Sequence, residues 1–319
     1  MPMVLPMAAQ VPEYYRSVDR LTWVVDDVHR VTGAWEKFGL ARIERRQNLE
    51  LAVTFRGKPA NAKVKMVSGF LGDVRVDWIQ PLGGTNAFAE YRKKHGSGVL
   101  SLMHRLPGAD AFEQEIERLR GAGVNVLQRW DYETGAGKIQ SAYMDTEGEG
   151  KYVLGLIYLP EGPAPEAAGV APDNKITQIA FAVHDLKPVA DYWIKAGLGA
   201  IAINPSNLSE CQYGGKPVEI RMSMGFQRGR KVPYEWIQPV TSPNIFDDHM
   251  KTHGEGLQHF GIGGVPDMEK AIADWNRMGP AVSQLGAWGE KGKPRSGRFA
   301  FLDTELFGGV STELTWQFR

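Results

Sequence analysis

Two acidic side chains occupy matching places in a short apolar motif that occurs twice in this chain. The first copy is VDWIQP at residues 76–81 and the second is YEWIQP at residues 234–239, so that Asp77 and Glu235 stand 158 residues apart. A carboxylate in such a strand can bind a metal, act as a general base or form a cross-strand ion pair. The motif by itself leaves these three roles open.

The same shift of 158 residues relates many other landmarks. It takes Trp35 to Trp193, Gly39 to Gly197, HGSG at 95–98 to HGEG at 253–256, Trp130 to Trp288, and DTE at 145–147 to DTE at 303–305. A constant shift over so many positions indicates a tandem duplication. The duplication is also an internal control. Residues on which the halves agree are expected to serve the fold, and differences at polar positions can distinguish a working half from a degenerate one.

Basic residues gather in two segments of the second half. Residues 288–298 (WGEKGKPRSGR) contain four basic side chains, whereas residues 130–140 contain only Lys138. The turn at 228–231 (RGRK) is likewise more basic than residues 69–73 (GFLGD). This asymmetry predicts an anionic substrate near the second half, although a solvated glycine-rich hairpin is the plain alternative. The expected substrate-binding residues are Arg228, Arg230, Trp288, Lys293 and Arg298.

Composition limits the class of protein. The chain has 319 residues, about two ordinary domains, and its 37 basic residues balance 37 acidic ones. Balanced charge argues against binding to nucleic acid or to a membrane surface. Cys211 is the single cysteine, no signal peptide is evident, and no stretch approaches the ~20 apolar residues that cross a bilayer. We therefore expect a cytoplasmic protein.

The order of apolar and polar segments predicts four modules. Each half begins with a β-branched strand, at 21–25 or 176–183, and a helix follows, at 28–38 or 186–196. Three strand-like runs come next, and the pattern then restarts at 99–106 and 257–263, with helices at 109–121 and 266–278. We therefore predict an α+β protein of four β-α-β-β-β modules, two in each half.

Composition also predicts the domain boundaries. Residues 161–174 (EGPAPEAAGVAPDN) are rich in proline, alanine and glycine and have no apolar period, which is typical of a linker. The expected division is an N-terminal extension at 1–16, a first domain at 17–160, the linker at 161–174, and a second domain at 175–319.

Several strings resemble the vicinal oxygen chelate superfamily, which includes glyoxalase I, methylmalonyl-CoA epimerase, extradiol dioxygenases and bleomycin-resistance proteins. They are ITQIAFAVHDL at 176–186, YEWIQP at 234–239, HGEGLQHFGI at 253–262 and FGGVSTEL at 307–314. The resemblance extends from about residue 17 to residue 317 and is strongest in the second half. It implies that paired modules form two cup-shaped mixed sheets with helices outside, and that a metal lies inside a cup.

The resemblance also implies where the metal ligands lie, on the first and last strands of the modules. In the second half these positions hold Gln178, Glu235, His259 and Glu313. In the first half they hold Arg20, Asp77, Ser101 and Gly155, which cannot bind a divalent ion well. We therefore predict one metal site per chain, in the second half, and a degenerate site in the first.

The donor set implied by the resemblance indicates the metal and the reaction. One imidazole, two carboxylates and one amide suit Zn²⁺, Ni²⁺, Co²⁺, Mn²⁺ or Fe²⁺. The set resembles that of some glyoxalase I enzymes, which implies an isomerase or lyase that moves a proton next to a metal-chelated carbonyl, through an enediolate or enolate. Glu313 is the expected base, and Glu235 is its partner on the opposite face.

Two alternatives stay open at this stage. An extradiol-type ring-cleaving dioxygenase with non-haem iron has the same architecture, but its 2-His-1-carboxylate set conflicts with Gln178. A metal-free small-molecule binding protein is the third reading. The expected partner is a small molecule rather than nucleic acid or a membrane. A homodimer also stays open, although four modules in one chain can close a site internally.

Overall fold

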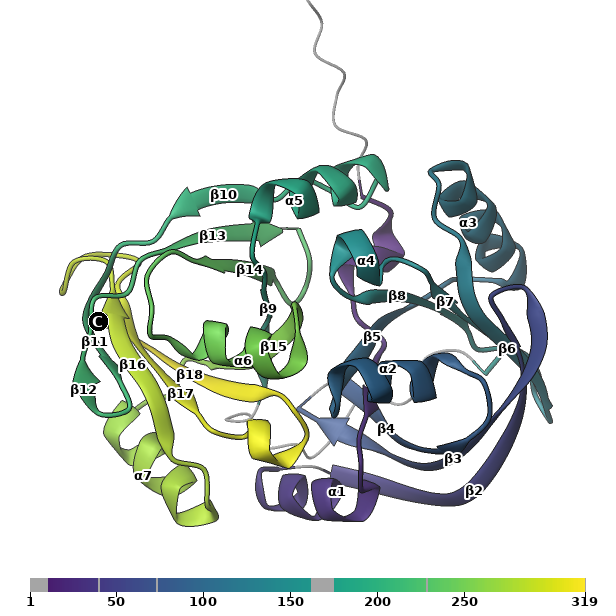
Figure 1. Ribbon diagram of the computed structural model, residues 1–319, viewed down its shortest axis with the longest axis horizontal. Coiled ribbons are helices and arrows are strands. Elements are labelled where there is room, and N and C mark those ends of the chain that lie inside the picture. Colours follow the sequence, from purple (N-terminus) through teal and green to yellow (C-terminus); the bar gives the residue numbers. More distant parts are fainter. Residues whose placement is uncertain (1–10, 40, 73, 162–174, 228, 319) are drawn as a thin grey trace, which may run out of the picture.

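Two strongly curved sheets lie side by side in the computed structural model (Figure 1). The structure describes residues 11–318 except 40, 73, 162–174 and 228. Most of the expected linker and residues 1–10 of the expected extension therefore lie outside the described residues. In the described ranges, no helix is long and apolar enough to cross a membrane.

The first half contains these elements: η1 (Glu13–Arg16), β1 (Arg20–Val24), α1 (Val28–Lys37), β2 (Ala41–Phe55), β3 (Lys58–Leu71), β4 (Val74–Gly83), α2 (Ala87–His95), β5 (Gly98–Arg105), α3 (Ala109–Gly121), β6 (Val126–Thr134), β7 (Gly137–Met144), α4 (Glu147–Gly150) and β8 (Val153–Tyr158). Its strands close into a barrel in the order β1-β4-β3-β2-β6-β7-β8-β5.

The second half contains β9 (Ile176–Ala182), α5 (Leu186–Lys195), β10 (Ala202–Pro205), β11 (Leu208–Tyr213), β12 (Lys216–Pro217), β13 (Met222–Gln227), β14 (Tyr234–Pro239), α6 (Ile245–His253), β15 (Gly256–Gly263), α7 (Met268–Met278), β16 (Val282–Trp288), β17 (Gly297–Leu302), η3 (Glu305–Phe307) and β18 (Ser311–Gln317). Its strands follow the order β10-β13-β14-β9-β15-β18-β17-β16-β11-β12.

The predicted fold class is confirmed, because each half is a cup-shaped mixed sheet built from two strand-helix-strand modules. The halves differ at one strand. In the first half, the long strand β2 pairs with both β3 and β6 and so closes the barrel. In the second half two short strands take its place, and β10 pairs with β13 while β11 pairs with β16. The chain between them, at 206–207, therefore opens the second sheet at this edge.

The first helix of each half begins at the predicted residue, Val28 or Leu186, and an aspartate caps it. Asp27 accepts hydrogen bonds from the backbone N–H groups of His29 and Arg30, and Asp185 accepts one from Lys187. These caps satisfy backbone donors that have no partner inside the helix. The short helices α2 and α6 begin in the same way, at Asn86 and Asn244.

A repeated tryptophan joins the two halves. The indole N–H of Trp193, on α5, donates to the carbonyl of Gly150 in the first half at 3.2 Å, and its ring stacks on Tyr152 with a centroid separation of 4.8 Å. Its copy, Trp35 on α1, donates to the carbonyl of Phe307 in the second half at 2.9 Å. Each half therefore packs the first helix of its sheet against the last module of the other. One apolar core runs through both halves.

The reciprocal packing of Trp35 and Trp193 against the opposite halves predicts that the two halves unfold together. Replacing Trp193, which is 1% exposed, by alanine should lower the free energy of unfolding by about 3–5 kcal/mol. Urea denaturation followed by circular dichroism and fluorescence measures the loss. The neighbouring Ile194→Ala, at a side chain 54% exposed, is the matched control and should change stability by less than about 0.5 kcal/mol. Separate transitions for the two halves would contradict the shared core.

Candidate metal centre

Four neighbouring strands of the second sheet, in the order β14-β9-β15-β18, each contribute one of the expected ligands. The ligands form two rows across the sheet. Ala180 pairs with Glu235 on one side and with His259 on the other. Two residues away, Gly261 pairs with Gln178 on one side and with Glu313 on the other. Opposite residues share a face of the sheet, so that the four side chains converge.

Small residues at the centre of both rows leave space between these side chains. A Cβ atom at Gly261 would lie 2.8 Å from Cβ of Gln178 and 3.5 Å from Oε2 of Glu313. A side chain there would therefore push the ligands apart. The first half has the larger Thr22 and the buried Met103 at the positions of Ala180 and Gly261, and both line a cavity of about 560 Å³ in that half.

The imidazole of His259 is oriented by its neighbour in sequence. Its Nδ1–H donates to Oε1 of Gln258 at 2.7 Å, so that Nε2 faces the carboxylates. This Nε2 is buried without a hydrogen-bond partner and lies 3.5 Å from Oε2 of Glu313 and 3.8 Å from Oε2 of Glu235. A ring held by its other nitrogen, with a bare nitrogen among oxygen donors, is the usual arrangement of a metal-binding histidine.

Burial makes the two carboxylates costly in the absence of a cation. Burial, and then the charge of Glu313, raise the pKa of Glu235 well above its usual value. Gln178 offsets part of this cost, because its amide N–H donates to Oε2 of Glu235 and, at 3.4 Å, to Oε2 of Glu313. Half a turn of the amide would present its oxygen to an ion instead.

These residues fit a divalent metal. Ligand atoms of Glu235, His259 and Glu313 all lie within 4.8 Å of one another, and Gln178 adjoins both carboxylates. A divalent ion at their centre would neutralise the two carboxylates and give the bare imidazole nitrogen a partner. The ions that suit this set are those named from the sequence, namely Zn²⁺, Ni²⁺, Co²⁺, Mn²⁺ and Fe²⁺.

A cavity of about 470 Å³ leads to these ligands, and Gln178, Glu235 and Glu313 line it. Its walls are mostly apolar and aromatic, with Met222, Met224, Phe226, Ile237, Phe246, Trp288, Phe299 and Phe301. Polar residues at its edge include Asn204 in β10, and Ser206 and Asn207 between β10 and β11, where the sheet opens. The cavity has the size of an ordinary small-molecule site.

The expectation of a basic substrate site is not supported by the positions of its residues. Among them, Trp288 lines the cavity. Arg298 points to the other face of β17, because Phe299 and Phe301 point into the cavity, and it pairs with Glu269 at 2.7 Å. Lys293 is exposed in a turn away from the cavity.

The expected basic turn at 228–231 also gives no support to a basic substrate site, because Arg230 does not line the cavity. Arg230 donates to the carbonyl of Tyr15 and lies 4.2 Å from the ring centre of Tyr234, so it anchors the segment before β1 instead of lining the cavity. Arg228 lies outside the described residues. The described residues that line the cavity include no lysine or arginine, so the positions of these residues give no support to an anionic substrate.

In the first half a guanidinium group takes the role of the cation. Arg20 stands at the position of Gln178 and lies 3.2 Å from Asp77, the counterpart of Glu235. Asp77 also accepts hydrogen bonds from Ser68 and Arg75. Burial opposes ionisation of Asp77, but the charges of Arg20 and Arg75 and these hydrogen bonds hold its pKa below the usual value. The degenerate site is therefore a neutralised ion-pair network.

Reasoning from sequence missed the residues that support the ligands. Gln258 orients His259, and its counterpart in the first half is Leu100. Ala180 and Gly261 leave space where the first half has Thr22 and Met103. In all three cases the residues differ between the halves at the shift of 158 residues, and this difference is the signal in the sequence that marks them.

A family model identifies the superfamily. The model of the glyoxalase/bleomycin resistance protein/dioxygenase superfamily matches residues 19–143 and again residues 177–301, and the chain belongs to this superfamily. The two matches are offset by the same 158 residues as the sequence landmarks. Comparison with curated proteins gives no match.

Solved structures with similar folds include a 4-hydroxymandelate synthase and a glyoxalase. A triple mutant of 4-hydroxymandelate synthase from Streptomyces coelicolor is similar with a TM-score of 0.62 and 17% identity, over 94% of this chain and 92% of that chain. The Mn(II)-bound glyoxalase from Novosphingobium aromaticivorans is similar with a TM-score of 0.53 and 12% identity, over 95% and 83%.

A third similar structure is a fusion protein of a xylose isomerase-like TIM barrel and a 4-hydroxyphenylpyruvate dioxygenase. The TM-score is 0.55 at 11% identity, and the match covers 99% of this chain but 51% of the fusion protein, so the chain spans about half its length. At these identities the comparisons show the fold, and the reaction has to be argued from the site.

The ligand set predicts which variants lose metal. His259→Ala and Glu313→Ala should each bind one divalent ion per chain fewer than the wild type, because each removes a donor from a buried site. Elemental analysis after reconstitution and desalting measures this loss. Ser101→Ala, at the counterpart of His259, is the matched control and should keep the wild-type metal content. Equal metal content in all variants would exclude the site.

The buried carboxylates of the two halves predict opposite pH effects in the metal-free protein. The pKa of Glu235 is raised, so its ionisation destabilises the fold as pH rises from its ordinary value near 4.5 to the raised value. Glu235→Gln should remove this loss, which is up to about 1.4 kcal/mol per pH unit in that window. Urea denaturation at several pH values with a chelator present measures the difference.

The matched variant in the first half should behave in the opposite way. The pKa of Asp77 is lowered, so its ionised form stabilises the fold above the ordinary carboxyl pKa and loses that effect on acidification. Asp77→Asn should therefore destabilise the protein by about 3 kcal/mol at neutral pH, because Arg20 loses a buried partner. Stabilisation by Asp77→Asn, or destabilisation by Glu235→Gln, would contradict this assignment.

Proposed function

We propose that this protein is a metal-dependent isomerase or lyase that moves a proton on a carbon next to a carbonyl. The observation that carries the proposal is the pair of carboxylates, Glu235 and Glu313, on either side of His259 at the end of an apolar cavity. A divalent ion held by these residues and Gln178 would act as a Lewis acid on the carbonyl. The alternative of a metal-free binding protein leaves the buried carboxylates without a counter-charge.

The chain's own residues have distinct tasks in this proposal. Glu313 lines the cavity, and its contact with the amide of Gln178 is long, at 3.4 Å, so its oxygens are the freer ones to accept a carbon-bound proton. Glu235 lies closer to the Gln178 amide and is suited to return a proton from the opposite row of ligands. Two such carboxylates serve either isomerisation or epimerisation.

The walls of the cavity indicate the class of substrate. The aromatic and methionine side chains that line it would bury an apolar or aromatic group and exclude water. Polar contacts come from the donor set and from the edge between β10 and β11. We therefore propose a substrate with two neighbouring oxygens at one end, such as a hydroxy ketone or an oxo acid, and an apolar body.

The gain or loss of a carbon-bound proton is a direct test. Protein reconstituted with Zn²⁺, Mn²⁺, Ni²⁺ or Co²⁺ should exchange solvent deuterium into members of a panel of aromatic hydroxy ketones, oxo acids and thiol adducts of oxoaldehydes. Proton NMR measures the exchange. Glu313→Gln should slow it about 100-fold or more while it keeps an oxygen donor for the metal, and Ser101→Ala should not change it.

The oxygenase reading is the competing outcome of the same experiment. Reconstitution with Fe²⁺, followed by oxygen uptake with a catechol or an aromatic oxo acid and no deuterium exchange with any metal, would overturn the proposed reaction. Metal content is measured in each sample, so that a loss of exchange can be separated from a loss of the ion.

A further inference from the structure

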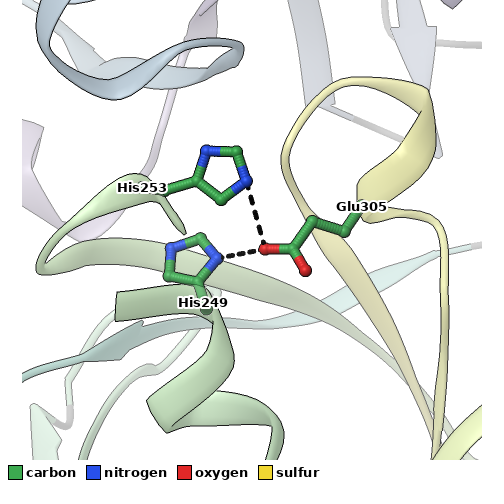
Figure 2. Close-up of side chains that lie close together, drawn as sticks. All are labelled: His249, His253 and Glu305. Carbon is green, nitrogen blue, oxygen red and sulfur yellow. Dashed lines mark hydrogen bonds and ion pairs between the residues drawn. The ribbon is translucent and has the colours of Figure 1, made fainter. Parts of the chain in front are cut away.

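A second cluster of metal-binding side chains lies at the junction of the two halves. Figure 2 shows His249, His253 and Glu305, and the rings of both histidines face one carboxylate oxygen. Nδ1 of His249 lies 2.5 Å from Oε1 of Glu305, and Nε2 of His253 lies 3.4 Å from the same oxygen. Ligand atoms of the three residues lie within 4.8 Å of one another. The proposed reaction uses none of these residues.

The local structure explains why the three side chains meet. His249 and His253 are four residues apart on α6, so their rings lie on one face of the helix with centroids 5.0 Å apart. This spacing on a helix is the one with which two histidines commonly bind one zinc ion. Glu305 begins η3, the short turn between β17 and β18.

The second nitrogen of His253 is held by the other half of the chain. Its Nδ1–H donates to the carbonyl of His95 at 2.8 Å, and Nδ1 of His95 donates back to the carbonyl of His253 at 2.5 Å. A backbone carbonyl on the far nitrogen is the usual support of a metal-binding histidine, because it orients the ring and leaves Nε2 for the ion. A void of about 10 Å³ beside His249 and His253 has room for about one water.

The first half again provides the internal control. There, His95 and Lys94 both contact Glu147, and the ammonium group of Lys94 lies 3.1 Å from its Oε1. The counterparts of Lys94 and Tyr91 in the second half are Thr252 and His249. The second half has therefore exchanged a cationic side chain next to the glutamate for a second imidazole.

From this exchange we infer that His249, His253 and Glu305 bind a divalent ion of the Zn²⁺ class, in addition to the ion of the proposed active site. Two imidazoles and one carboxylate are the donors that suit such an ion, and a water would complete its coordination. Because His253 also bonds the backbone of His95, the ion ties α6 and η3 to the end of α2 in the other half. Its role is structural, at the junction of the halves.

Zinc stoichiometry tests the inference. The full chain is stripped with a chelator, dialysed against Zn²⁺ alone, desalted and analysed for metal. The wild type should bind about two ions per chain, His259→Ala one, His249→Tyr one, and the double variant none. His249→Tyr introduces the residue of the first half, Tyr91, and the ion it keeps at His259 reports that the chain is folded.

A second variant guards against misfolding at the buried His249. Thr252→Lys leaves all three ligands in place but restores the ammonium of Lys94 next to the glutamate, and it should also lower the stoichiometry by one. In the His259→Ala background, Zn²⁺ should raise the melting temperature, and this shift should vanish when His249→Tyr is added.

The inference is overturned if His259→Ala binds no zinc, or if His249→Tyr and Thr252→Lys both keep the wild-type stoichiometry. The cluster would then be a metal-free hydrogen-bond network like that around Glu147. Either result is independent of the proposed reaction, which depends on the ion at His259.

Discussion

A buried carboxylate that needs a positive charge is the constraint on which both halves of this structure depend. The cup of each sheet places an acidic residue, Asp77 or Glu235, at the same point of an apolar wall. Water cannot solvate that charge, so the chain must supply a cation or keep the group protonated. The first half supplies the guanidinium of Arg20. Among its described residues that line the cavity, the second half has no such cation and instead adds a second carboxylate, near a bare imidazole nitrogen, a combination that an ion or a proton would stabilise.

The duplication allows the two halves to be compared position by position. They share scaffold residues but differ in the polar residues around Asp77 and Glu235. Trp35 and Trp193 hold the same position in each half and join each sheet to the last module of the other. Residues of both halves therefore belong to one apolar core. Beside Asp77 the first sheet has the larger Met103 and Thr22, where the second sheet has Gly261 and Ala180.

At the junction of the halves, a cationic side chain beside a carboxylate is again absent from the second half at the equivalent position. Arg20 and Lys94 each lie next to a carboxylate in the first half, and Gln178 and Thr252 stand at their positions in the second. In both places a fixed side-chain cation gives way to a set of neutral and anionic donors. A side-chain cation is permanent, whereas a metal ion can polarise a substrate or cross-link two elements. The proposed metal ions would thus give the second half functions that the ion pairs of the first half do not have.

The sequence by itself determined the duplication, the four modules, the first residues of the helices at Val28 and Leu186 and the family of the fold, because these depend on local spacing that repeats. The resemblance to the vicinal oxygen chelate superfamily also pointed to Gln178, Glu235, His259 and Glu313, and their counterparts in the first half cannot bind a divalent ion well. Only the tertiary structure decided that Arg298 points away from the cavity and that Arg230 binds the backbone near Tyr15, because strand register and contacts 215 residues apart control those directions. It also decided that Gln258 orients His259 and that His249, His253 and Glu305 meet, since convergence of side chains from separate elements is a property of packing and not of sequence spacing.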